Sequence, residues 1–244
     1  MKYYRRFKAI KAISFDLDDT LYSNRSVMLA TERAMIEFFA DNLPSELSAK
    51  YVFDRSFWHP FRKQVIKQSP ELIHDVSAIR FACYRLGIAS LGVNEADSQE
   101  ITQRAMHHFM TERCKVNVPE QSHQLLKKLS AHLPVVAISN GNVDTKAIGI
   151  EHHFRYIFHA GDRAGNRILR SKPHPDMFHQ ACQQLSITPQ ELLHVGDCGQ
   201  ADIKGAINAG CQSAWLPHYN VGKPLSVLPD IELSDVGELL SLLQ

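Results

Sequence analysis

The stretch Ala12-Ile13-Ser14-Phe15-Asp16-Leu17-Asp18-Asp19-Thr20-Leu21-Tyr22 decides the fold class of this chain. Residues 12 to 15 predict a buried strand, and they run directly into two carboxylates, Asp16 and Asp18. Parallel α/β sheets bind their ligands at the edge formed by the carboxyl ends of the strands. An aspartate placed there can attack phosphorus, and a second one can manage the proton of the leaving group. The pair alone is a weak signal, because Asp-x-Asp also arises by chance at turns.

Two more predicted strands end in polar residues. Residues 133 to 138 are apolar and are followed by Ser139-Asn140-Gly141, whose hydroxyl and backbone N–H groups suit phosphate oxygens. Asp144 is expected to start a short helix. Residues 192 to 195 predict a third strand, which ends in Gly196-Asp197. Each of these features is ordinary by itself, but their order along the chain suits one active site at one sheet edge.

Two further candidates lie beside predicted helices. Lys172 precedes Pro173 and a predicted helix over residues 174 to 185, which places the lysine on a loop at a helix N-terminus. Asp202 is expected to cap a helix that runs to Ala209. Lys172 and the second acidic pair, Asp197 and Asp202, complete a set of motif residues that would rarely occur together by chance.

On these motifs the chain resembles the haloacid dehalogenase-like hydrolase superfamily, along nearly the full length of its core. The resemblance implies that Asp16 is the nucleophile, that Asp18 is the general acid and base, and that the phosphate ligands are Ser139, Asn140 and Lys172. It also implies a magnesium ion held by the Asp16 carboxylate, the Asp18 backbone carbonyl and Asp197. Asp202 would then orient the lysine or a metal-bound water.

One departure from the family pattern weakens the assignment of Asp202. The loop over residues 198 to 201 reads Cys-Gly-Gln-Ala and lacks the small polar or acidic residues often found between the last two acids. The charges are nevertheless consistent with the implied chemistry. A phosphate dianion would be repelled by Asp16, Asp197 and Asp202, and Mg²⁺ together with Lys172 would offset that repulsion.

The segment between Tyr22 and Val116 has a different pattern of apolar and polar residues. It shows no buried-strand pattern, and amphipathic helices are predicted over residues 31 to 43, 70 to 89 and 95 to 114. Strands and helices alternate again afterwards, with further strands over residues 156 to 160 and 211 to 216. The sequence therefore predicts an α/β fold with a doubly wound, mostly parallel Rossmann-like sheet and an inserted all-helical domain.

The predicted boundaries are 1–22 and 117–244 for the α/β catalytic core and 23–116 for the helical domain. In the resembled family such an insertion is a cap that closes over the site and selects substrates. Aromatic and charged residues of the insertion, among them Trp58 and Tyr84, are candidates for that selection, although packing in the core of the insertion is the better account of the aromatic ones.

Composition excludes several classes of protein. The chain has 244 residues, 44% of them hydrophobic, and a formal net charge of +1, so it shows no electrostatic bias toward nucleic acid. No run approaches the length of a membrane span, and no apolar signal-peptide region follows the basic N-terminal cluster. The five cysteines lack metal or redox spacing, which favours a reducing cytoplasm. The thirteen histidines lack metal-site spacing and are expected at the surface.

The expected function is magnesium-dependent hydrolysis of a small phosphate ester, with neither nucleic acid nor a membrane as a partner and the oligomeric state left open. The motifs resemble those of bacterial flavin-pathway phosphatases, which implies FMN or 5-amino-6-(5-phospho-D-ribitylamino)uracil as substrate. The alternatives are a broad-specificity sugar phosphate or pyridoxal phosphate phosphatase, a phosphomutase and a non-catalytic binding module. A dehalogenase would need no acid at position 18, and a phosphonate hydrolase would need a cap lysine with no sign in this sequence.

Overall fold

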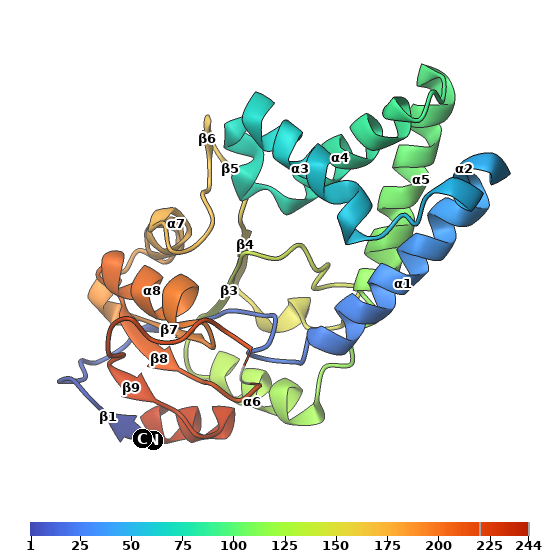
Figure 1. Cartoon of the computed structure of the whole chain (residues 1–244). Helices are drawn as coiled ribbons and strands as arrows, with labels where there is room; N and C mark the ends of the chain where they lie inside the picture. The colour runs from blue at the N-terminus through green and yellow to red at the C-terminus, as the bar shows by residue number, and fades with distance from the viewer. Residues whose placement is uncertain (220, 244) are drawn as a thin grey trace. The chain divides into compact units, whose positions relative to one another are not determined.

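The computed structural model describes residues 1–219 and 221–243. The chain forms two compact units, one of Met1–Asn24 with Val116–Gln244 and one of Arg25–Lys115. The domain boundaries expected from the sequence, after residues 22 and 116, stay a prediction; these compact units change after Asn24 and after Lys115. The first unit is an α/β unit and the second is all helical (Figure 1).

A seven-stranded sheet with the order β1-β9-β8-β7-β2-β3-β4 forms the centre of the α/β unit. All neighbouring strands pair in parallel except β1, which is antiparallel to β9. The strands are β1 (Lys2–Tyr3), β2 (Ala12–Phe15), β3 (Val135–Ser139), β4 (Tyr156–His159), β7 (Leu192–Gly196), β8 (Gln212–Trp215) and β9 (Ile231–Glu232). The mostly parallel fold class and the five strands expected from the sequence are confirmed, with shifted ends.

The register of the central strands sets the position of the site. In β2, Phe15 pairs with Val195 of β7 on one side and with Ala137 of β3 on the other. Because the three strands run parallel and in register, the residues that follow them emerge at the same edge of the sheet. Asp16 therefore lies between the ends of β3 and β7.

Helices cover both faces of this sheet. Figure 1 shows α7 (Asp176–Leu185) and α8 (Lys204–Asn208) on one face, and α6 (Glu120–Ser130) with the 3₁₀ helix η5 (Val236–Leu243) on the other. Apolar residues of α7, such as Phe178 and Ala181, pack against Val136 and Ile138 of β3. The remaining short elements are η2 (Glu151–His153), η3 (Pro189–Glu191), η4 (Gly199–Ile203, a π-helical turn) and the hairpin β5 (Arg163–Ala164) with β6 (Arg167–Ile168).

Two expectations about helix starts are wrong. Asp144 caps a turn rather than a helix: its carboxylate accepts from the N–H groups of Lys146 and Ala147, but the chain leaves the helical path at Gly149, with φ +77°. Asp202 does not cap a helix. It lies inside the π-helical turn η4, whose N-cap is Cys198, and its carboxylate is bound elsewhere.

The helical unit consists of α1 (Arg25–Asn42), α2 (Ser45–Lys50), α3 (Arg55–Gln68), η1 (Pro70–His74), α4 (Val76–Ser90) and α5 (Glu95–Arg113). The predicted helix over residues 70 to 89 is divided at Asp75, whose carboxylate accepts from Ser77 N–H and Ala78 N–H and so caps α4. Buried residues such as Phe39, Phe53 and Phe109 form an apolar cluster inside this unit, which therefore has its own core.

All five cysteines are free thiols, three of them buried. Among the described residues, no helix combines the length and the apolar character that crossing a membrane requires.

Candidate active site

The buried ammonium group of Lys172 contacts acids from two different motifs. Its Nζ donates to Asp16 Oδ1 at 2.7 Å, to Asp202 Oδ1 at 2.6 Å and to the Ile138 carbonyl at 2.7 Å. An ammonium group has three donors, so all three are used. Two motifs that are 156 residues apart in the chain, at Asp16 and Lys172, thus meet at the edge of the sheet.

The carboxylates keep this lysine charged. Burial lowers the pKa of Lys172, but Asp16 and Asp202 together raise it above its ordinary value. Burial also raises the pKa of Asp202, and Lys172 and His194 outweigh that effect, so the pKa of Asp202 lies well below its usual range. Lys172 and Asp202 therefore form a buried ion pair. Burial raises the pKa of Asp16 against the opposing attraction of Lys172.

Asp202 accepts from three donors. Besides Lys172, the ring nitrogen Nε2 of His194 lies 3.2 Å from Asp202 Oδ1, and the Cys198 N–H donates to Oδ2 at 2.9 Å. Burial lowers the pKa of His194 to about 4, so the imidazole is neutral. Its Nδ1 lies 2.9 Å from Ser14 Oγ, which is consistent with a hydroxyl that donates to Nδ1 and an Nε2–H that donates to Asp202. These contacts fix the position of Asp202, and Asp202 in turn fixes the position of Lys172.

The acids also form the kind of group that binds a metal ion. Carboxylate oxygens of Asp16, Asp197 and Asp202 all lie within 4.8 Å of one another, and all three residues are buried. Burial, followed by the charges of Asp202 and Asp19, raises the pKa of Asp197 to about 7. One lysine does not balance three carboxylates. An oxygen-only donor set with excess negative charge fits a hard divalent cation such as Mg²⁺.

The model of the haloacid dehalogenase-like hydrolase family matches residues 10–210 of the chain. The chain belongs to this family.

Its relatives in the family indicate the reaction. The chain is 34% identical over 247 residues to 5-amino-6-(5-phospho-D-ribitylamino)uracil phosphatase YigB of Escherichia coli (strain K12), with 100% of each chain covered. It is 26% identical over 249 residues to N-acylneuraminate-9-phosphatase of Homo sapiens, covering 96% of this chain and 94% of the relative. The chain is a phosphatase of the haloacid dehalogenase-like family.

A solved structure with a similar fold belongs to an enzyme that is named for a different reaction. A 2-haloacid dehalogenase from Pseudomonas syringae pv. Tomato DC3000 superimposes with a TM-score of 0.84 at 25% identity, covering 96% of this chain and 98% of that one. This likeness concerns the fold. Attack on a carbon atom by one aspartate requires no further acids. This site also contains Asp18, Asp197 and Asp202.

Asp18 and its neighbours form a tight turn after β2. The Tyr22 hydroxyl donates to Asp18 Oδ1 at 2.9 Å, and the backbones of these two residues form an isolated parallel bridge. Asp19 adopts φ 59°, in the left-handed region, and its Oδ1 accepts from the Asn24 N–H at 2.8 Å. Asp can occupy this region at modest cost. The turn fixes where the Asp18 carboxyl group lies relative to Asp16.

The residues predicted to bind phosphate differ in what their side chains contact. Ser139 is buried at the end of β3, and its Oγ accepts from the Gly141 N–H at 3.0 Å. The Asn140 side chain instead bonds to the backbone of Lys172 through both of its polar atoms. Asn140 thus positions the lysine, and phosphate binding by the Ser139-Asn140-Gly141 turn stays a prediction.

Three residues of the site were not predicted from the sequence. Trp215 Nε1 donates to the Asp197 carbonyl at 2.9 Å. A Cβ on Gly222 would lie 2.5 Å from Asp197 Oδ2, so only glycine allows this close approach. His194 is fully buried, as is most of His153, which corrects the expectation that the histidines are at the surface. A polar residue inside the apolar run of residues 192 to 195 was the one available signal for His194.

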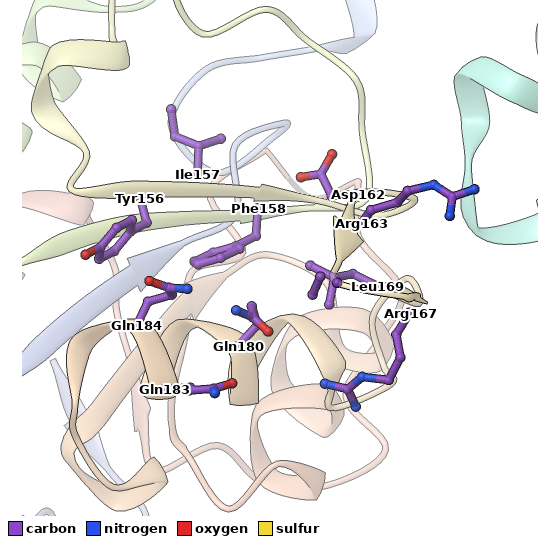
Figure 2. Close-up of a pocket in the computed structure, with 12 residues that line it drawn as sticks. Tyr156, Ile157, Phe158, Asp162, Arg163, Arg167, Leu169, Gln180, Gln183 and Gln184 are labelled. Atoms are coloured by element: carbon purple, nitrogen blue, oxygen red, sulfur yellow. The ribbon is translucent and has the colours of Figure 1, made fainter.

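One hollow of the α/β unit lies away from these residues. It has a volume of about 750 Å³ and is bounded by β4, α7 and the β5–β6 hairpin. Figure 2 shows Tyr156 and Phe158 facing Gln180 and Gln184 across it. No residue of the four motifs lines this hollow, so its size is no evidence for catalysis there.

Proposed function

We propose that the chain hydrolyses phosphate monoesters through a phospho-aspartate on Asp16, with Mg²⁺ as cofactor. The observation that carries the proposal is the buried group of Asp16, Asp197 and Asp202 around Lys172. So many buried carboxylates in one place are costly for stability unless they bind cations. A phosphate ester brings oxygens that such cations bind.

Asp16 is the proposed nucleophile. Lys172 holds Oδ1, and no hydrogen bond from the described part of the chain engages Oδ2, so Oδ2 can attack phosphorus. The bond between Oδ2 and phosphorus forms as the bond between phosphorus and the ester oxygen breaks. The Lys172 contact fixes the direction of the carboxylate, which reduces the entropy lost in reaching the transition state.

Asp18 is the proposed general acid and base. It donates a proton to the ester oxygen as that oxygen leaves, and it then accepts a proton from the water that attacks the phospho-aspartate. The second attack breaks the bond between phosphorus and Asp16 and releases phosphate. The Tyr22 hydroxyl, at 2.9 Å from Asp18 Oδ1, holds the carboxyl group in place for both steps.

The proposed metal ligands are the Asp16 carboxylate, the Asp18 backbone carbonyl and Asp197. Mg²⁺ bound there would offset the carboxylate charges and polarise the phosphoryl oxygens. Asp202 acts differently in this proposal, since its three donors commit it to Lys172, His194 and Cys198. Its task is to hold Lys172, which in turn neutralises charge on the phosphate.

We propose a flavin-pathway substrate, either 5-amino-6-(5-phospho-D-ribitylamino)uracil or FMN. Support comes from the full-length relative whose name specifies the first compound. Both compounds join a ribityl phosphate to a planar ring. A reducing, cytoplasmic location is part of the proposal and is supported by the five free thiols.

A panel of phosphate esters tests the whole proposal. The purified chain, with Mg²⁺, is assayed for phosphate release from the ribitylaminouracil phosphate, FMN, pyridoxal phosphate and simple sugar phosphates, ranked by kcat/KM. We expect the first two to rank highest. A higher rank for sugar phosphates would contradict the flavin assignment and leave a general phosphatase. Absence of release from every ester would contradict the reaction itself.

A further inference from the structure

The helical unit contains a cavity of its own. It has a volume of about 400 Å³ and is lined by side chains of α3 and α4, among them Trp58, Arg62, Arg80 and Tyr84. A smaller cavity of about 80 Å³ adjoins it, since Arg55, Trp58, Arg80 and Tyr84 line both. We call the two together the arginine cavity. Its volume lies in the range of sites that bind small organic molecules.

Two buried donors in this cavity have no partner among the described residues. Thr31, on α1, is 1% exposed, and its Oγ1 has no hydrogen bond with any described residue. Arg80 Nε is likewise buried without a partner among the residues that the structure describes. Both residues line the smaller cavity. Native structures rarely leave such groups unpaired, so each of them calls for a ligand or a water molecule.

The rest of Arg80 is held firmly. Its guanidinium carbon lies 3.6 Å from the centroid of the Phe109 ring, and its Nη1 donates to the Tyr84 hydroxyl at 3.2 Å. A guanidinium that is packed on an aromatic ring and fixed by a hydrogen bond keeps its remaining donors in one fixed plane. Arg80 Nε thus lacks a partner in the described part of the chain even though neighbouring side chains hold Arg80 in place.

The lining of the cavity carries a net positive charge, because three arginines outnumber two carboxylates, Glu32 and Asp54. Arg55 is paired with Glu32 at 3.0 Å, but within the described ranges neither Arg62 nor Arg80 has a carboxylate at ion-pair distance. Oxygen acceptors with partial or full negative charge are therefore favoured as ligands. The aromatic walls, Trp58 and Tyr84, favour a flat molecule over a compact one.

We propose that the arginine cavity binds a planar ring whose carbonyl oxygens accept from Arg80 Nε and Thr31 Oγ1. The arginine cavity is then the ring-binding site of the helical unit. This proposal rests on the proposed function only for the choice of probe. Riboflavin serves as the probe, because it carries a flat dicarbonyl ring and a ribityl chain but no phosphate. Ribitol is the matched ligand without the ring.

Binding is measured on the full chain in the Asp16→Asn background, in EDTA, by titration calorimetry. We expect saturable binding of riboflavin and none of ribitol. Quenching of Trp58 emission in a Trp215→Phe variant, which leaves one tryptophan, reports whether the ring reaches this cavity. Riboflavin that does not bind, or that binds without quenching Trp58, would overturn the proposal.

Thr31→Val is the most informative variant. Valine has nearly the shape of threonine and removes only the unpaired hydroxyl, so the melting temperature should be unchanged or higher. Riboflavin binding should nevertheless weaken by about 3- to 10-fold, the equivalent of one hydrogen bond. If a water molecule alone pairs the hydroxyl, affinity will equal that of the parent, and the proposal is wrong.

Arg80→Lys tests the second donor while keeping the charge. We expect riboflavin binding to weaken by about 10-fold or more, because lysine lacks the planar Nε donor. Arg85→Gln, on the same helix, is the control: Arg85 pairs with Glu95 on the surface and does not line the arginine cavity. Equal affinities of the Arg80→Lys and Arg85→Gln variants would overturn the assignment.

The outcome is separable from that of the proposed function. Riboflavin carries no phosphate, so its binding does not depend on the acids around Lys172. Binding with the expected variant effects would establish the cavity even if FMN is not hydrolysed. Hydrolysis of FMN without riboflavin binding would leave the proposed function and remove the ring site.

Discussion

The side chain of Asn140 and the backbone of Lys172 hold each other through two hydrogen bonds. Asn140 Oδ1 accepts from the Lys172 N–H at 2.7 Å, and Asn140 Nδ2 donates to the Lys172 carbonyl at 3.0 Å. The residues are 32 positions apart, on the loop after β3 and the loop before α7. One amide thus connects the predicted phosphate turn to the lysine that holds Asp16.

Replacing Asn140 by Ala should misplace Lys172. We expect kcat to fall by about 10- to 100-fold, because the ammonium group loses its fixed position, and the free energy of unfolding to fall by about 1–3 kcal/mol. Steady-state kinetics and urea denaturation measure the two effects. Gln183→Ala, which truncates an exposed amide on α7, is the control. Unchanged kcat in Asn140→Ala would contradict the positioning role.

Asp16→Asn should remove turnover without unfolding the protein. Asparagine has nearly the shape of aspartate but is a very poor nucleophile, so we expect kcat to fall by about 10³-fold or more. Phosphate release gives kcat, and circular dichroism checks the fold. Asp176→Asn, at an aspartate that pairs with Arg170 on the surface, is the matched control. A folded Asp16→Asn variant with wild-type turnover would eliminate Asp16 as the nucleophile.

Removal of divalent metal should abolish activity and lower stability. In EDTA we expect no turnover, and addition of Mg²⁺ should restore it. At a concentration of 100 times Kd, Mg²⁺ should also stabilise the folded chain by about 2.7 kcal/mol, because it binds only the folded state. Thermal melts with and without Mg²⁺ measure this. Asp197→Asn should lose most of the stabilisation, and an equal gain in that variant would exclude Asp197 as a ligand.

Gly222→Ala should weaken the same metal site from its other side. The new Cβ would lie 2.5 Å from Asp197 Oδ2 and 2.6 Å from the Asp197 carbonyl oxygen, so one of the two groups must move. We expect a higher concentration of Mg²⁺ for half-maximal activity, by about 10-fold if the shift costs about 1.4 kcal/mol. The control is Val221→Ala, at an exposed neighbour. Identical Mg²⁺ dependence in both variants would contradict this prediction.

His194 should make the folded chain less stable in acid. Its pKa falls from 6.5 to about 4 on folding, because burial disfavours the charged ring. A lowered pKa in the folded state means that the unfolded state binds more protons between these values. The contribution is therefore fully present above about pH 6.5 and is lost as the pH falls toward 4, by about 3 kcal/mol in total.

The difference between wild type and His194→Gln isolates that effect. Glutamine can still donate to Asp202 but does not titrate. Urea denaturation of both proteins in EDTA at pH 7.5 and pH 5 should show a larger loss of stability in the wild type. Parallel losses would show that the imidazole does not titrate differently in the folded state.

The sequence by itself determined which chemical groups are present and where they lie along strands and helices. An apolar run that ends in Asp16, and similar runs before Ser139 and Asp197, are local patterns, because burial and strand geometry act over a few neighbouring residues. Parallel pairing then brings the ends of such strands to one edge. The sheet, its inserted helices and the set of motif residues were predictable for this reason.

Only the tertiary structure decided which of those groups touch. Asp202 was expected to cap a helix, and it instead accepts from Lys172, His194 and Cys198 inside a π-helical turn. Thr31 Oγ1 and Arg80 Nε, which have no partner within residues 1–219 and 221–243, come from two helices that the sequence places far apart. Such contacts depend on how distant segments pack, and the free energies of alternative packings differ by amounts that no local pattern records.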